Sequence, residues 1–227
     1  MPPEPGESIE RSPMEPAIYQ ASPEEGRFYQ GEVLESVREW VPVYTAQQAV
    51  EGTQSSVHPL AVVFAHDCDL IQDWRERKDD QYAEGDLRNI ILCPARDADT
   101  LRQEHKITSR LFELVRQNKL DRYQYLGEIP DNHDRCDRGH PPMLVDFKNY
   151  FTVRTVELYR QAAVADDPPL SRRACLATPW REHLQLRFAM FHARIGLPRD
   201  HFTPLSRRAP LPSPSVTASD LAAPTPS

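Results

Sequence analysis

The residues best suited to chemistry lie in one short segment, His66–Asp69, which directly follows the apolar run Val62–Ala65. The apolar run has the composition of a strand covered on both faces, and such a strand carries the residues after it to the rim of a sheet. There the Cys68 thiol and the His66 imidazole have the residue types of a nucleophile and its base. The two aspartates of the segment have the residue type that holds Mg²⁺ or activates water.

Structural roles for Cys68 and Asp69 compete with catalysis. In an extended strand His66 and Cys68 share one face and the two aspartates share the other, so only one pair can point at a site. Negative charge beside a thiol also opposes formation of the thiolate, which needs a base or a positive field. The composition therefore favours Cys68 as a buried thiol that fills space, and Asp69 as a cap of the following turn through backbone hydrogen bonds.

Two further groups of residues have the types that bind metals. His133, Cys136 and His140 follow the pattern H-x2-C-x3-H in one polar loop and could join the first segment around zinc. Asp146, on a later strand, could join the two aspartates of the first segment around Mg²⁺. Paired CxxC half-sites would be more specific, and a polar loop is usually a solvent-exposed connection. We predict no cofactor and leave the metal open.

Composition limits the classes to which this 227-residue chain can belong. Many of its 22 prolines lie toward the ends, and residues 1–25 and 205–227 are predicted to be disordered tails around one globular domain, 26–200. The formal net charge of −7 argues against a broad basic surface for nucleic acid. The chain has no apolar run long enough for a membrane span, no secretory signal, and four widely spaced cysteines, so we expect a cytoplasmic protein without membrane association.

Hydrophobic patterning predicts a set of strands separated by polar loops and one helical segment. The strands are expected at 27–34 with a bend at Gly31, at 40–44 as a short edge strand, at 60–65, at 89–94 where Pro94 ends the strand, at 123–126, at 143–147 and at 150–153. Loops are expected at 51–56 and 130–142, and residues 73–87 are expected to be irregular. Residues 99–120 have the spacing of an amphipathic helix or a broken pair of helices.

The clearest element is a helix at 178–196. Thr178 is expected as its N-cap and Pro179 as its first residue, and Gly196-Leu197-Pro198 has the pattern of a C-terminal stop. Its apolar stripe consists of Leu184, Phe188, Phe191 and Ile195. A single stripe of this width usually completes the core of its own domain, so we expect docking within the chain rather than a dimer contact.

The order of these elements resembles the PemK/MazF-like group over residues 27–158. The likeness is carried by the strand order and by four short matches, Gln30-Gly31-Glu32-Val33, Pro59–Phe64, Ile91-Leu92-Cys93-Pro94 and Leu144-Val145-Asp146 leading to Thr152-Val153-Arg154. Proteins of that group are small SH3-like barrels, and many are RNA-cleaving toxins of toxin–antitoxin pairs. The resemblance implies an α+β fold with a small, strongly bent SH3-like β-barrel at 26–160, a helical insertion and a docked C-terminal helix. The helical ending resembles that of a group of uncharacterised bacterial proteins.

The resemblance also implies where a site would lie. In the toxins an Arg beside the proline that opens the second strand and a Thr two residues after the proline that closes the third perform the cleavage; here these places hold His58 and Arg96. A His and an Arg could supply acid–base catalysis and stabilise a phosphorane-like charge, and the same replacement fits a barrel that has lost nuclease activity.

Two functions therefore stay open. The first is a bacterial toxin–antitoxin or phage-defence protein that acts on RNA, a phosphodiester-cleaving hydrolase if it is an enzyme, with His58, Arg96, His66, Cys68 and Asp69 at its site. The second is a non-enzymatic module that holds a protein partner on the barrel rim or on the C-terminal helix. Convergence of the candidate residues in one concavity favours catalysis, and scattered positions favour the interaction module.

Overall fold

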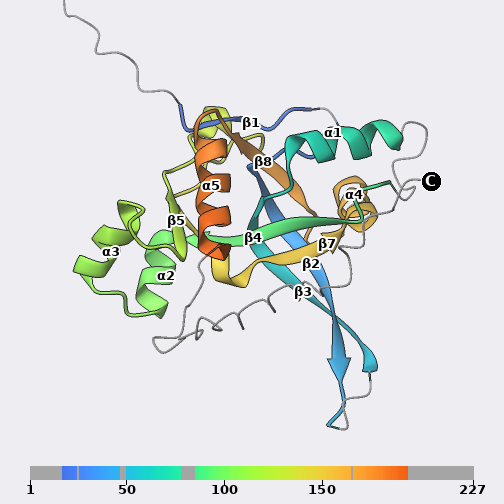
Figure 1. Ribbon diagram of the computed structural model, residues 1–227, viewed down its shortest axis with the longest axis horizontal. Coiled ribbons are helices and arrows are strands. Elements are labelled where there is room, and N and C mark those ends of the chain that lie inside the picture. The colour runs from blue at the N-terminus through green and yellow to red at the C-terminus, as the bar shows by residue number, and fades with distance from the viewer. Residues whose placement is uncertain (1–16, 25, 47–49, 78–84, 165, 194–227) are drawn as a thin grey trace, which may run out of the picture. The chain divides into compact units, whose positions relative to one another are not determined.

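The computed structural model describes residues 17–24, 26–46, 50–77, 85–164 and 166–193, all in one compact unit that ends at Ala193 (Figure 1). In chain order the elements are β1 (Tyr19–Ala21), β2 (Glu32–Tyr44), β3 (Val50–Val63), α1 (Asp67–Glu76), β4 (Asn89–Asp97), α2 (Ala98–Glu104), α3 (Ser109–Arg116), β5 (Tyr123–Leu126), the 3₁₀ turn η1 (Asp131–His133), β6 (Met143–Asp146), the 3₁₀ turn η2 (Phe147–Asn149), β7 (Phe151–Arg154), α4 (Thr155–Ala163), β8 (Ser171–Leu176) and α5 (Trp180–His192). The protein is a mixed α+β fold, as predicted. None of the helices in these ranges has the length and apolar character to span a membrane.

The strands form one antiparallel sheet in the order β1-β8-β2-β3-β4-β6-β5, and β7 also pairs with β4. Within the described residues β1 and β5 end this order without pairing with each other, so the sheet is not closed. The predicted small, strongly bent SH3-like barrel is therefore not confirmed. Strand β8, which the sequence reasoning missed, pairs with both β1 and β2, so the sheet extends beyond β2 by two strands that the prediction did not contain.

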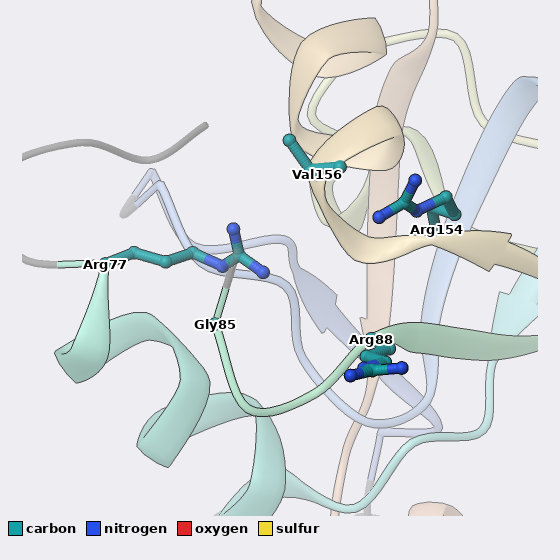
Figure 2. Close-up of a pocket in the computed structure, with 5 residues that line it drawn as sticks. All are labelled: Arg77, Gly85, Arg88, Arg154 and Val156. Atoms are coloured by element: carbon teal, nitrogen blue, oxygen red, sulfur yellow. The ribbon is translucent and has the colours of Figure 1, made fainter. Parts of the chain in front are cut away.

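Strand β4 changes its partner halfway along. Its first residues, Asn89–Leu92, pair with β7, and its last, Ala95–Asp97, pair with β6. Pro94 lies at the changeover, where neither of these two strands needs its missing N–H, so the strand continues past the proline instead of ending there. The pairing with β7 also brings Arg154 to the segment that leads into β4 (Figure 2).

The central strands are buried on both faces, which confirms the prediction for the apolar run that precedes His66. Alternate residues of β3 belong to different clusters because strand side chains alternate in direction. Val62 packs in the cluster that includes Leu184 of α5. Val63 packs in the cluster that includes Leu70 of α1 and Leu158 of α4. Helices therefore cover both faces of this part of the sheet.

The residues predicted as a helix or a broken pair form the pair α2 and α3. Asp97 caps α2 by accepting a hydrogen bond from the Thr100 N–H, and Thr108 caps α3 in the same way from the Leu111 N–H. Both helices pack on β5 and β6 through a small cluster of their own.

Helix α5 docks on its own sheet, as predicted. Phe188 contacts the rings of Phe64, Phe147 and Tyr150, with centroids 4.6, 5.7 and 5.9 Å away. The helix is shorter than expected at its start, because Pro179 is its N-cap and Thr178 gives no cap hydrogen bond. The expected stop at residues 196–198 and the C-terminal tail lie outside the described residues.

The first half of the chain differs most from the sequence prediction. Strand β1 lies inside the stretch expected as an N-terminal tail; Tyr19 is buried, and its hydroxyl donates to the Gly127 carbonyl at 3.1 Å. The first predicted strand begins only at Glu32, after Gly31 has turned the chain with a φ of 76°. The expected edge strand at 40–44 and the expected loop at 51–56 together form one long hairpin, β2–β3.

Candidate functional site

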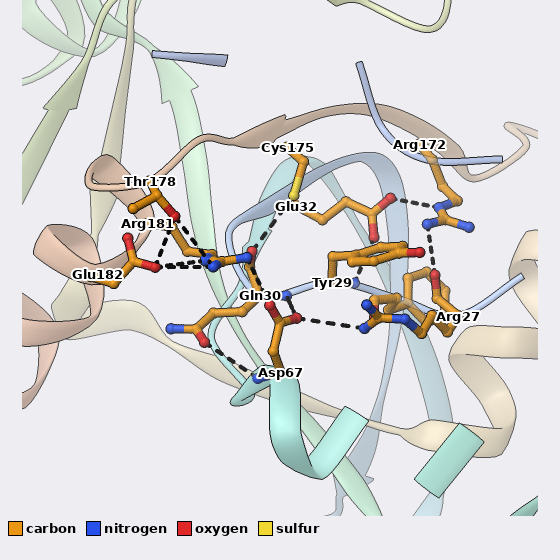
Figure 3. A network of polar contacts seen from close by, with 11 residues as sticks. Arg27, Tyr29, Gln30, Glu32, Asp67, Arg172, Cys175, Thr178, Arg181 and Glu182 are labelled. Atoms are coloured by element: carbon orange, nitrogen blue, oxygen red, sulfur yellow. Dashed lines mark hydrogen bonds and ion pairs between the residues drawn. The ribbon is translucent and has the colours of Figure 1, made fainter. Parts of the chain in front are cut away.

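The segment His66–Asp69 begins a helix rather than lining an open rim. His66 is the N-cap residue of α1, and both aspartates fall in its first turn, where the helix dipole favours negative charge. Asp67 joins this turn to two other elements (Figure 3). Its carboxylate accepts hydrogen bonds from the Gln30 N–H at 3.0 Å and from Arg181 Nη1, on α5, at 2.7 Å. The role of Asp67 is therefore to fasten α1 to the loop before β2 and to the start of α5.

The structure corrects the prediction for Cys68. Its side chain is exposed rather than buried, because the helix begins directly after the strand and turns this residue to the solvent. Its Sγ lies 3.5 Å from Asp69 Oδ1. The expected division of this segment into a His/Cys face and an Asp face is also wrong, because it assumed an extended strand.

The other two predicted site residues lie elsewhere and have partners of their own. His58, on β3, lies with its Nε2 2.8 Å from Glu39 Oε2 and stacks on Phe151 with ring centroids 3.8 Å apart. Arg96, on β4, donates to Glu104 of α2 at 2.7 Å. Of the five predicted residues, Cys68 and Asp69 alone contact each other in the described part of the chain. The structure does not bring the five together.

The predicted metal sites are not assembled either. The described residues contain no group of three His, Cys, Asp or Glu side chains that could hold a metal ion. The Asp146 carboxylate accepts hydrogen bonds from Nε and Nη2 of Arg122, at 2.9 and 2.6 Å, and from the Asn149 side-chain amide at 2.7 Å. The carboxylate proposed for Mg²⁺ is thus used to hold the turn between β6 and β7.

A buried ion pair organises the loop that was proposed for zinc. Arg173, on β8, donates to the Asp134 carboxylate at 2.8 and 2.5 Å, to the Gly139 carbonyl at 2.7 Å and to Glu35 at 3.0 Å. Burial raises the pKa of Asp134, but hydrogen bonds from Arg173 and from two backbone N–H groups outweigh it, so the pKa lies below its usual range. This loop has a structural role.

The neighbouring arginine of β8 has a similar role. Arg172 donates from Nε to Glu32 Oε1 at 2.5 Å, and Glu32 is fully buried. Burial raises the pKa of Glu32 although Arg172 acts in the opposite direction. The carboxylate partners of Arg172 and Arg173, Glu32 and Asp134, come from distant parts of the chain.

The feature that the sequence reasoning missed is the outer part of the β2–β3 hairpin. Strand β2 pairs with β8 only over Glu32–Glu35, and β3 pairs with β4 only over Leu60–Val63. Among the described residues, the two strands pair beyond these points only with each other, and in Figure 1 they extend away from the rest of the sheet.

One face of this hairpin carries a group of exposed apolar side chains. Trp40, Pro42 and Tyr44 alternate along β2, and because paired residues share a face, Val50 opposite Tyr44 and Val57 opposite Arg38 lie on the same side. Trp40, Tyr44, Val50 and Val57 are 52, 60, 64 and 37% exposed. We call these five residues, Trp40, Pro42, Tyr44, Val50 and Val57, the hairpin face.

A hollow that is open to solvent lies at the foot of the hairpin face. Its lining is polar apart from Trp40 and includes Arg38, Glu157 and Arg160. Arg160 donates to both Glu157 oxygens at 2.8 Å, which is the main reason that the pKa of Glu157 is lowered. The indole N–H of Trp40 donates to Glu157 at 3.4 Å, so the base of the hairpin is attached to α4.

Comparisons of the chain with protein-family models, with curated proteins and with solved structures find no match.

Proposed function

We propose that the protein is a non-enzymatic interaction module that associates with a second copy of itself through the hairpin face. The observation that carries this proposal is the presence of four large, exposed apolar side chains on one side of one hairpin. Exposed apolar patches that are contiguous are usually interaction sites, whereas single exposed apolar residues need no explanation.

The low charge of the hairpin permits a second copy as the partner. Each copy carries a formal net charge of −7, so two copies repel each other over most of their surfaces. From Trp40 to Val57 the sequence contains one charged residue, Glu51. The hairpin is thus a surface on which like-charged copies can meet without placing like charges together.

The shape of the hairpin face is also suited to its own copy. The β2 side carries the bulky residues Trp40, Pro42 and Tyr44, and opposite Trp40 and Pro42 the β3 side carries the small residues Ser55 and Thr53. This arrangement forms a ridge beside a shallow strip. The ridge of one copy can lie over the strip of the other, which provides the close packing that a specific interface needs.

The available area agrees with a weak dimer. The two aromatic side chains are more than half exposed and offer about 100–150 Å² each. With the valines and Pro42, each copy offers about 500 Å², so a dimer would bury about 1,000 Å², the lower end for specific interfaces. We therefore expect association that depends on protein concentration.

RNA cleavage, which the PemK/MazF-like resemblance implies, has less support. The His58 ring is hydrogen-bonded to Glu39 and stacks on Phe151, and Arg96 is hydrogen-bonded to Glu104. In the described ranges no contact joins His58 and Arg96. If cleavage of an RNA pool by the purified protein were found and were lost in a His58→Ala/Asp69→Ala variant, the enzyme would replace the interaction module as the proposed function.

Sedimentation velocity of the full chain tests the dimer. Runs from about 1 μM to 1 mM cover association free energies of about −8 to −4 kcal/mol. We expect Tyr44→Asp to raise the dimer Kd at least about tenfold, because it places a carboxylate in the apolar contact. Leu186→Asp is the matched control, since Leu186 of α5 is 58% exposed and lies outside the hairpin. A monomeric wild type at all concentrations, or equal effects of the two variants, would rule out this function.

A further inference from the structure

A second hollow, with a volume of about 280 Å³, lies between α2, α3, β5 and the residues just before β6. These helices lie beside β5, the last strand in the order of the sheet (Figure 1). They share a small apolar cluster with β5 and β6. Four apolar or aromatic residues line the second hollow, namely Ala98, Phe112, Tyr125 and Pro142. Its walls can therefore hold an apolar group.

Backbone hydrogen bonds fix these walls in place. The Ala98 N–H, at the start of α2, donates to the Pro142 carbonyl at 2.9 Å. The Tyr125 N–H, on β5, donates to Oδ1 of Asn118 at 2.7 Å, and Asn118 lies two residues after the end of α3. A site whose walls are already in place loses little free energy to ordering when a ligand binds.

Two opposite charges lie side by side in the second hollow without pairing. Asp99 and Arg102 both line it, and they lie one turn apart on the same face of α2. Arg102 donates to the Ser109 hydroxyl at 3.0 Å and lies over the Phe112 ring, 4.8 Å from its centroid. Within the described ranges no ion pair joins Asp99 and Arg102, and neither has another ion-pair partner. Both charges are thus available to a ligand.

The third charged residue of the lining is Arg116, at the end of α3. It lies 3.6 Å from Glu113, and both side chains are 54% exposed. Exposed pairs of this kind contribute about 0–1 kcal/mol, so a ligand can compete for Arg116. The lining therefore offers two guanidinium groups and one carboxylate beside an apolar wall.

We propose that the second hollow binds a free α-amino acid with an apolar side chain. Arg102 and Arg116 bind its carboxylate, because guanidinium groups donate pairs of N–H groups to carboxylates. Asp99 binds its ammonium group, and the side chain packs on Phe112 and Tyr125. A ligand with one charge of each sign matches a lining with charges of both signs. A simple anion would be repelled by Asp99, and a simple cation by the two arginines.

The size of the second hollow agrees with this ligand. Sites for drug-sized molecules have about 300–1,000 Å³, and a volume of about 280 Å³ lies just below that range. The hollow thus fits a molecule as small as an amino acid. A residue inside a peptide carries neither the free ammonium nor the free carboxylate, so the charges favour the free amino acid.

Isothermal titration calorimetry of the full chain tests this site with L-phenylalanine and L-leucine. We expect saturable binding of at least one of them with a Kd below about 1 mM. Three related compounds each lack one feature: N-acetyl-L-phenylalanine lacks the ammonium, L-phenylalaninamide lacks the carboxylate, and glycine lacks the apolar side chain. Each should bind at least about tenfold more weakly. Absence of saturable binding of both amino acids, or equal affinity for any of the three related compounds, would overturn the proposal.

Variants assign the two charged contacts. Asp99→Asn should remove the preference for phenylalanine over its N-acetyl derivative and keep the preference over the amide, because it removes only the partner of the ammonium. Arg102→Gln should do the reverse, because it removes a partner of the carboxylate. Arg110→Gln is the matched control, since Arg110 is an exposed arginine of α3 that does not line the hollow, and it should keep both preferences.

This pattern separates a binding role from a structural one. Damage to the fold would weaken the binding of all compounds alike, whereas the loss of one charged contact changes one preference. Equal effects of Asp99→Asn and Arg102→Gln on both preferences, or the same effect from Arg110→Gln, would contradict the assigned contacts.

Discussion

Replacement of Asp134 by Asn should destabilise the protein strongly, because it leaves the buried Arg173 cation without its main counter-charge. Removal of one member of a buried ion pair costs about 3–5 kcal/mol. Glu35 stays 3.0 Å from Arg173 and compensates part of the loss, so we expect the lower end, about 3 kcal/mol. For a protein of this size that corresponds to a fall in Tm of about 6–12 °C.

Urea unfolding followed by tryptophan fluorescence measures this loss. The matched control is Glu104→Gln, in the exposed pair with Arg96, where the side chains are 44 and 46% exposed and the loss should be below about 1 kcal/mol. Arg173→Met added to Asp134→Asn should recover part of the stability, because the unpaired charge is removed as well. Equal losses for Asp134→Asn and Glu104→Gln would refute the assigned role of the buried pair.

The lowered pKa of Asp134 also predicts how the stability of the protein depends on acid. The pKa of Asp134 is lower in the folded protein than its ordinary value of about 3.9, so the unfolded state binds its proton first as the pH falls. The stabilisation by Asp134 is complete above about pH 4 and is lost as the pH falls through the folded pKa. The difference in unfolding free energy between wild type and Asp134→Asn should therefore narrow below about pH 4. A constant difference would contradict this assignment.

Two further predictions concern glycines and cysteines. Gly85→Ala should lower the Tm clearly, because the added methyl group would collide with the buried Asp73 carboxylate. Gly52→Ala should change the Tm little, because no atom lies within 4 Å of the added methyl group. Similar melting curves for the two variants would contradict this. In the native protein a thiol reagent should label the exposed Cys68 and leave the buried Cys175 unlabelled until the protein unfolds. The reason is that burial raises the pKa of the Cys175 thiol to about 12, so little reactive thiolate is present. Fast labelling of Cys175 would contradict its burial.

Sequence reasoning succeeded where the signal is local. The strand predicted at 123–126 is β5, and the strand predicted at 150–153 corresponds to β7. Strand β8 was missed because it contains two arginines, which fit inside a sheet only together with their carboxylate partners. Arg172 and Arg173 occupy a central strand, and their carboxylates Glu32 and Asp134 lie 140 and 39 residues away in the chain. No local pattern reveals that these charges are neutralised.

The candidate site was mislocated for a similar reason. Residues 66–69 were interpreted as the end of a strand. Two aspartates followed by two apolar residues at helical spacing, Leu70 and Trp74, are typical of the start of a helix. The hairpin face also had a signal. Residues 40–44 are apolar at every position, and their partner strand at 51–56 is mostly polar. An apolar strand that pairs only with a polar one covers no core, and this favours an exposed ribbon.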